Sequence, residues 1–200
     1  MTAPTEVVTQ AKRRLAGTEQ FHLAGNPMGF DVKSFWQWAH SDLLGNALRG
    51  VVAEYLVARA CGEVEGVREE WDAHDLVLDG RIRVEVKSSA YVQSWAQRRR
   101  STITFGIAPT LGWSASTNAS ATDKKRNSDV YVFALLAHQE RQTIEPLDVG
   151  QWRFFVLPAR VLDERCAGQR SIGLAPLLRL GAAECTFAEL ASRLRDAVSG

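Results

Sequence analysis

Residues 75–87 read Asp-Leu-Val-Leu-Asp-Gly-Arg-Ile-Arg-Val-Glu-Val-Lys, and this stretch decides the fold expected of the chain. A short apolar run follows the first aspartate, Asp79 and Gly80 are typical turn residues, and the second run alternates apolar with charged side chains. The pattern predicts a β-hairpin whose second strand ends in Glu-Val-Lys. In an extended strand, Glu85 and Lys87 share one face, about 6–7 Å apart, and the three apolar residues occupy the other.

The register of this hairpin decides whether Asp75 joins the two charged side chains. A two-residue turn pairs Asp75 with Val84 and sends its carboxylate to the apolar face. A three-residue turn over 78–80 pairs it instead with Arg83, beside Glu85. A functional site therefore requires an odd-length loop or a bulge, and a regular two-residue hairpin would count against it.

The residue types suit a divalent metal. Mg²⁺ prefers hard oxygen ligands and keeps several waters. Asp75 and Glu85 supply two carboxylates, and the carbonyl of Val86 is placed to supply a third oxygen. Lys87 would orient or deprotonate a water, or stabilise the transition state, and a role as base requires a lowered pKa. The structural alternative is a surface ion pair between Glu85 and Lys87.

A long helix from Asp42, its expected N-cap, to Ala60 offers a further carboxylate, and Gly62 stands where the helix ends. One face of this helix carries small residues and one acid: Ala47, Gly50, Val51, Glu54 and Ala58. Small residues let a helix approach a sheet closely, so Glu54 is expected to project into the cleft. The alternative is a solvated Glu54 paired with a surface arginine.

Five runs rich in β-branched and aromatic residues predict strands: Asp75–Leu78, Arg81–Ala90, Thr102–Ala108, Val130–Ala137 and Trp152–Leu157. The run 130–137 is apolar throughout, which suits a strand covered on both faces. The segment 111–128 is rich in Ser, Thr, Asn and Ala and is interpreted as a long loop inserted between two strands. Thr186 and Glu189 form a capping box before an apolar helical stripe.

This order of elements predicts an α/β fold, a mixed central β-sheet flanked by helices, or α+β if the antiparallel part dominates. We expect a mobile N-terminal arm over 1–30, with a short helix over Thr5–Leu15. A core would span 31–160, and a helical segment over 161–200 would pack on it.

Composition bounds the remaining functions. The chain has 200 residues, is 46% hydrophobic and carries a net charge of +1, so any basic surface must be local. Three widely spaced cysteines argue against a zinc site and for reduced thiols. No signal-peptide pattern and no apolar run of membrane-spanning length is present, which predicts a soluble, cytoplasmic protein.

Glu54, Asp75 and Glu85-Val86-Lys87 together resemble the PD-(D/E)XK nuclease superfamily, which includes many restriction endonucleases. The shared order is a helix with an acid, a strand with Asp and a strand with Glu-x-Lys, over about residues 42–137. The resemblance implies a restriction-endonuclease-like fold and Mg²⁺-dependent DNA hydrolysis, with Mn²⁺ as a substitute. It makes Asp75 and Glu85 metal ligands, Lys87 the catalytic lysine and Glu54 an accessory ligand. His74 stands where many members have proline.

Polar and basic residues that follow the motif are candidate nucleic-acid contacts: Ser88, Ser89, Gln93, Gln97, Arg98, Arg99, Arg100, Lys124, Lys125 and Arg126. The serines and basic residues could bind phosphates, and the glutamines could read base edges. Tyr91 and Trp95 could stack on an unpaired base. The structural alternatives are a solvated arginine turn and a Trp95 that belongs to the core.

Three functions remain open. The first is a metal-dependent DNA endonuclease, for which a homodimer is compatible because two sites would cut both strands. The second is a catalytically silent nucleic-acid-binding or assembly module with the same fold. The third is a small-molecule enzyme that uses the carboxylates for another purpose, although the chain lacks a Gly-rich phosphate loop.

Overall fold

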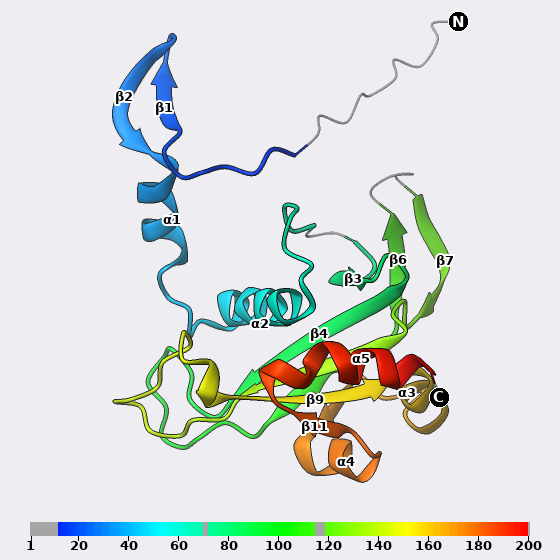
Figure 1. Ribbon diagram of the computed structural model, residues 1–200. Helices are drawn as coiled ribbons and strands as arrows, with labels where there is room; N and C mark the ends of the chain where they lie inside the picture. Colours follow the sequence, from blue (N-terminus) through cyan, green and yellow to red (C-terminus); the bar gives the residue numbers. More distant parts are fainter. Residues whose placement is uncertain (1–11, 70–71, 115–118, 200) are drawn as a thin grey trace, which may run out of the picture. The chain divides into compact units, whose positions relative to one another are not determined.

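The computed structural model describes residues 12–69, 72–114 and 119–199 (Figure 1). The described residues divide into two compact units. One contains residues 12–41 and 65–68, and the other contains residues 42–64 and the chain from 69 onward.

The first unit is a β-hairpin followed by a helix. Its elements are β1 (Gln20–Leu23), β2 (Asn26–Asp31) and α1 (Val32–His40). The two strands are antiparallel and meet at a turn in which Ala24 and Gly25 both have positive φ, 50° and 84°. Asp31 caps α1 by accepting a hydrogen bond of 2.8 Å from the backbone N–H of Ser34.

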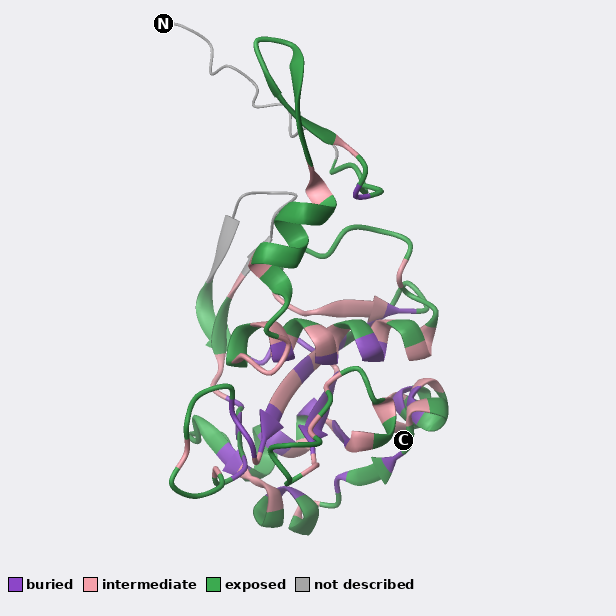
Figure 2. Ribbon diagram, turned by 90° about the vertical axis from the view of Figure 1, so that its left-hand side faces the viewer, coloured by how far each residue is buried: buried purple, intermediate pink, exposed green. Residues whose placement is uncertain are grey.

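The first unit differs from the expected arm, because residues 20–31 form paired strands. Of the helix expected over Thr5–Leu15, residues 5–11 lie outside the described part, and residues 12–15 are not helical. Helix α1 has no buried residue, and Figure 2 colours most of this helix and of the hairpin as exposed. Residues 20–30 of the expected arm thus contain a hairpin that their polar and glycine-rich composition did not reveal.

The second unit is built on a five-stranded mixed sheet in the order β11-β9-β8-β4-β3. Its elements are α2 (Asn46–Cys61), β3 (Leu76–Leu78), β4 (Ile82–Ala90), β5 (Thr104–Gly106), β6 (Thr110–Ser114), β7 (Ala119–Lys125), β8 (Val130–Leu136), η1 (Val149–Gln151), β9 (Trp152–Pro158), α3 (Ala159–Arg165), β10 (Ser171–Gly173), α4 (Leu174–Arg179), β11 (Ala183–Cys185), η2 (Phe187–Glu189) and α5 (Leu190–Ser199). Strands β4 and β8 are parallel, and the other neighbours are antiparallel. The predicted mixed sheet with flanking helices is confirmed.

The sheet separates two apolar cores, and β8 contributes to both. Val130, Val132, Ala134 and Leu136 face one core, which α2 and α5 cover. The alternate residues of β8 face the second core, which contains residues of β5, α3, β10 and α4. All seven residues of β8 are buried, as its continuous apolar run predicts.

The second unit contains elements that the sequence did not reveal. The segment expected as a loop over 111–128 contains the hairpin β6–β7, whose second strand is polar and lacks large apolar residues. Helix α2 starts three residues later than expected, because Gly45 is its N-cap and Asp42 instead accepts a hydrogen bond from the N–H of Gly45. The capping box of Thr186 and Glu189 is confirmed.

Candidate active site at the β3–β4 hairpin

The turn between β3 and β4 has the odd length that the site requires. Leu78 pairs with Ile82, which leaves three turn residues, and Asp79 and Gly80 have φ values of 53° and 66°. The turn nevertheless lies one residue later than expected, over 79–81 rather than 78–80. Leu78 stays in the strand because its side chain is fully buried in the core. The expected pairing of Asp75 with Arg83 was therefore wrong, since Val77 takes that place.

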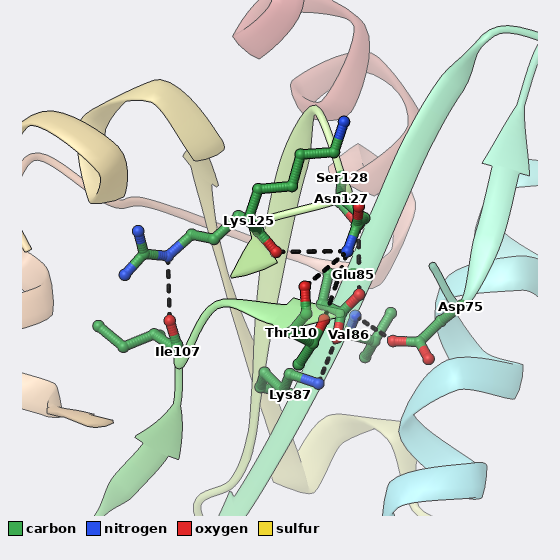
Figure 3. A network of polar contacts seen from close by, with 10 residues as sticks. Asp75, Glu85, Val86, Lys87, Ile107, Thr110, Lys125, Asn127 and Ser128 are labelled. Carbon is green, nitrogen blue, oxygen red and sulfur yellow. Dashed lines mark hydrogen bonds and ion pairs between the residues drawn. The ribbon is translucent and has the colours of Figure 1, made fainter. Parts of the chain in front are cut away.

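Asp75 is bonded to β4 on both sides of Glu85. Its backbone N–H donates to the carbonyl of Val84 at 3.0 Å, and its Oδ2 accepts from the N–H of Val86 at 2.6 Å. Figure 3 shows this carboxylate at the edge of β4, next to α2. β3 ends before it reaches Val86, so the side chain of Asp75 accepts the backbone N–H of Val86 in place of a strand neighbour. This bond fixes the position of Asp75.

Glu85 is held from two directions. Lys87 forms an ion pair with its Oε1, and the hydroxyl of Ser128 donates to its Oε2 at 3.2 Å (Figure 3). The side chains of Glu85 and Lys87 are 17% and 33% exposed, so solvent still reaches the pair. Ser128 was missed by the sequence reasoning, because its position depends on the parallel pairing of β4 with β8.

The charges around Asp75 strongly perturb its ionisation. Burial, and then the negative charges of Glu85 and Glu54, raise the pKa of Asp75 from its ordinary value of 3.8 to about 7. Burial, the largest single influence, lowers the pKa of Lys87, but the ion pair with Glu85 and the negative charges of Asp75 and Glu54 together outweigh burial and raise that pKa. Lys87 is therefore an ammonium ion at neutral pH, which does not favour the expected alternative of a lysine base.

Helix α2 approaches the sheet beside this site. A Cβ added to Gly50 would lie 4.0 Å from Oγ of Ser88, so the helix backbone lies close to β4. The face expected to be apolar is partly exposed, and the buried face consists of Arg49, Ala53, Leu56 and Val57. Glu54 is half-buried and close enough to Asp75 for its charge to affect that carboxylate.

The carboxylates do not form a larger metal-binding cluster. Within residues 12–69, 72–114 and 119–199, no group of three or more His, Cys, Asp and Glu side chains is placed to hold one metal ion. The local oxygen donors are thus Asp75 and Glu85, with Glu54 as a more distant negative charge.

The loop after β4 uses its polar side chains internally. Gln93 is 6% exposed, and its Oε1 accepts from the guanidinium of Arg49 at 2.9 Å. Gln97 accepts from the N–H of Gln93 at 2.7 Å and donates to Ser101 at 3.0 Å. Gln93 is therefore buried and hydrogen-bonded internally, which does not favour the expected role of reading base edges.

Two further candidates for phosphate contacts are buried. Ser89 is 7% exposed, and its hydroxyl accepts from the N–H of Thr104 at 3.4 Å. Arg126 binds the carbonyls of Ile107 and Cys166 and the carboxylate of Asp163. These positions do not favour the expected phosphate contacts, because backbone groups of neighbouring segments already bind both side chains.

The other candidates remain accessible to different degrees. Ser88 and Gln97 are half-buried, whereas five basic residues are exposed: Arg98, Arg99, Arg100, Lys124 and Lys125. Arg100 forms an ion pair with Glu140 at 3.1 Å. Trp95 is 56% exposed, which excludes the alternative that it belongs to the core.

Arg49 is the most unusual residue that sequence reasoning missed. It is 2% exposed, and its guanidinium donates to the carbonyl of Leu44, the side chain of Asn46 and Gln93. Within the described part of the chain its Nε has no hydrogen-bond partner, and burial lowers the pKa of Arg49. The sequence does contain a sign of this role, because Arg49 lies in an apolar stripe of the helix. A charged residue in such a stripe is rarely buried without a specific partner.

Comparison with known proteins places the chain among the endonucleases. Residues 32–186 match the family model of bacteriophage T4 endonuclease IV, and the chain belongs to this family. The matched segment includes α2, the β3–β4 hairpin and Ser128. No curated protein and no solved structure matches the chain. None of the helices in the described residues has the length and apolar character needed to cross a membrane.

Proposed function

We propose that the chain is a metal-dependent endonuclease of the PD-(D/E)XK type that hydrolyses phosphodiester bonds of DNA. The observation that carries the proposal is the convergence of Asp75, Glu85 and Lys87 at one end of a hairpin, with Asp75 bonded on both sides of Glu85. Membership of the bacteriophage T4 endonuclease IV family supports the nuclease activity.

The donors fit Mg²⁺, with Mn²⁺ as a substitute. Asp75 and Glu85 offer hard carboxylate oxygens, and within the described chain Oδ1 of Asp75 accepts no hydrogen bond. The raised pKa of Asp75 reflects burial first and then repulsion by Glu85 and Glu54, and a divalent cation would relieve that repulsion. The carbonyl of Val86 and the carboxylate of Glu54 are accessory ligands in this proposal. When bound, the ion would lower the pKa of a bound water and neutralise charge on the scissile phosphate.

The protein residues have separate roles in this reaction. Lys87 stays protonated, so it donates hydrogen bonds to a phosphate oxygen or to the attacking water and stabilises the negative charge that develops. Ser128 keeps one oxygen of Glu85 in a fixed direction, and the N–H of Val86 does the same for Asp75. Both carboxylates are thereby oriented before the substrate arrives.

Two observations favour a catalytically silent binding module as the second candidate. Lys87 already occupies Oε1 of Glu85, and the described residues contain no three-residue group of metal ligands. A module of this kind would bind nucleic acid through its exposed basic residues without turnover.

Cleavage assays separate the two candidates. Single-stranded, duplex and branched DNA, with RNA as a comparison, are incubated with the protein in Mg²⁺, in Mn²⁺ and in EDTA. We expect metal-dependent cutting that Asp75→Asn, Glu85→Gln and Lys87→Ala each reduce at least 100-fold. Asp79→Asn is the matched control, because Asp79 is an acid of the same hairpin whose carboxylate binds Arg195. Binding without cutting in every metal, unchanged in Lys87→Ala, would establish the silent module.

A further inference from the structure

A cavity of about 890 Å³ lies beside the candidate active site. Its walls come from the β3–β4 turn, the segment before β8, the start of α3 and the end of α5. In Figure 1, α3 and the C-terminal end of α5 lie together at this end of the second unit. Four arginines and two aspartates line the cavity: Arg81, Arg83, Arg126, Arg160, Asp129 and Asp163.

Two of the four arginines are neutralised by the aspartates. Arg83 binds Asp129 with Nη2 to Oδ1 at 2.5 Å, and Arg126 binds Asp163 at 2.7 Å. The side chains of the other two, Arg81 and Arg160, are exposed and make no hydrogen bond or ion pair within the described chain. Among the described residues that line the cavity, four arginines face two aspartates, so the lining carries a net positive charge.

Ser128 connects the lining of the cavity with the candidate active site. Ser128 lines the cavity and donates its hydroxyl to Glu85 at 3.2 Å. Arg83 also lines it and precedes Glu85 by two residues on the same face of β4, a separation of about 6–7 Å. A nucleic-acid strand advances about 3.4 Å per nucleotide, so this distance corresponds to about two nucleotides.

We propose that this cavity binds the phosphate backbone of the nucleic-acid strand next to the scissile bond. Arg81 and Arg160 neutralise its phosphates, and Arg83 and Arg126, fixed by their aspartates, form the walls. Ligand pockets for small organic molecules are predominantly apolar, whereas this lining is dominated by charge. The inference rests on the proposed function, because it takes the polymer that is cut to be the ligand.

The test compares two double variants that remove the same charge. Arg81→Gln/Arg160→Gln alters the cavity, and Arg165→Gln/Arg179→Gln removes two exposed arginines outside its lining. Binding of a fluorescent 20-nucleotide DNA is measured in EDTA at several salt concentrations, and circular dichroism checks the fold. We expect the cavity variant to bind about tenfold more weakly. Its salt slope should fall by about 1.4–1.8, because two phosphate contacts contribute about 0.7–0.9 each.

Several outcomes would overturn this inference: no DNA binding by the unmodified protein, equal effects of the two double variants, or an unchanged salt slope in the cavity variant. Competition by inorganic phosphate or a mononucleotide at the concentration of strand phosphates would identify a small-anion site instead. Because binding is measured in EDTA, the result does not depend on cleavage. If the protein binds DNA through the cavity but cuts it in no metal, the proposed hydrolysis is refuted and the cavity proposal stands. If the protein cuts DNA and the cavity variant binds as the unmodified protein does, only the cavity proposal is refuted.

Discussion

Replacing Asp75 with asparagine should stabilise the protein while abolishing the proposed nuclease activity. The folded state raises the pKa of Asp75 from 3.8 to about 7, first through burial and then through Glu85 and Glu54. At about 1.4 kcal/mol per pH unit, this difference corresponds to at most ~4 kcal/mol. Attraction by Lys87 and the relaxation of the fold reduce the net effect, so we expect a gain of about 1–2 kcal/mol in the free energy of unfolding.

The sign and the pH window follow from the raised pKa. Below about pH 4 the carboxyl is protonated in both the folded and the unfolded states, so Asp75 costs nothing. Between about pH 4 and 7 the unfolded state releases its proton first, and stability falls as pH rises. Above about pH 7 the full cost is present. Asparagine carries no charge at any pH, and its side-chain oxygen can still accept from the N–H of Val86.

Urea denaturation in EDTA at pH 4 and pH 8 measures this difference. The variant should match the unmodified protein at pH 4 and exceed it at pH 8. Mg²⁺ should then stabilise only the unmodified protein, by about 1.4 kcal/mol at a concentration ten times its dissociation constant. Asp79→Asn should have the opposite effect on stability, because Arg195 lowers the pKa of Asp79. Equal stabilities at pH 8, with an equal response to Mg²⁺, would refute the reasoning.

Three other substitutions test the surroundings of the site. Ser128→Ala should reduce cleavage about tenfold with unchanged DNA binding, because Glu85 loses its orienting donor, and Thr at this position should restore activity. Arg49→Met should lower the free energy of unfolding by about 1–3 kcal/mol, because buried acceptors lose their donor, and hydrogen exchange should increase in the loop after β4. Asp129→Asn should cost about 0.5–1 kcal/mol at pH 7 and nothing at pH 2, measured in urea, because Arg83 lowers the pKa of Asp129.

The parts of the site that could be predicted are those set by local sequence. Alternation places Glu85 and Lys87 on one face of a strand whatever the rest of the fold does, and glycine marks the turn. The position of the turn was wrong by one residue because the burial of Leu78 extends β3. That burial is a tertiary property, and no local pattern distinguishes it from a turn position.

The missed residues depend on contacts between distant segments. Ser128 reaches Glu85 because β8 pairs with β4 in parallel, across an intervening hairpin. Arg49 is buried because the loop after β4 brings Gln93 against α2, 44 residues further along the chain. The sequence alone reveals neither the contact of Ser128 with Glu85 nor that of Arg49 with Gln93. It shows only a serine before a strand and an arginine on an apolar helix face.

The internal hydrogen bonds also restrict which residues can bind a substrate. Arg126 satisfies the carbonyls of Ile107 and Cys166, and leaving a buried polar group unpaired costs about 1–3 kcal/mol. If Arg126 turned to a phosphate, both carbonyls would lose their donor, and the phosphate contact would have to offset both costs. Arg81 and Arg160 make no such bonds, so a phosphate contact would replace only their hydrogen bonds to water. Nucleic-acid affinity should therefore arise from arginines that the fold does not require, such as Arg81 and Arg160, rather than from the buried Arg126.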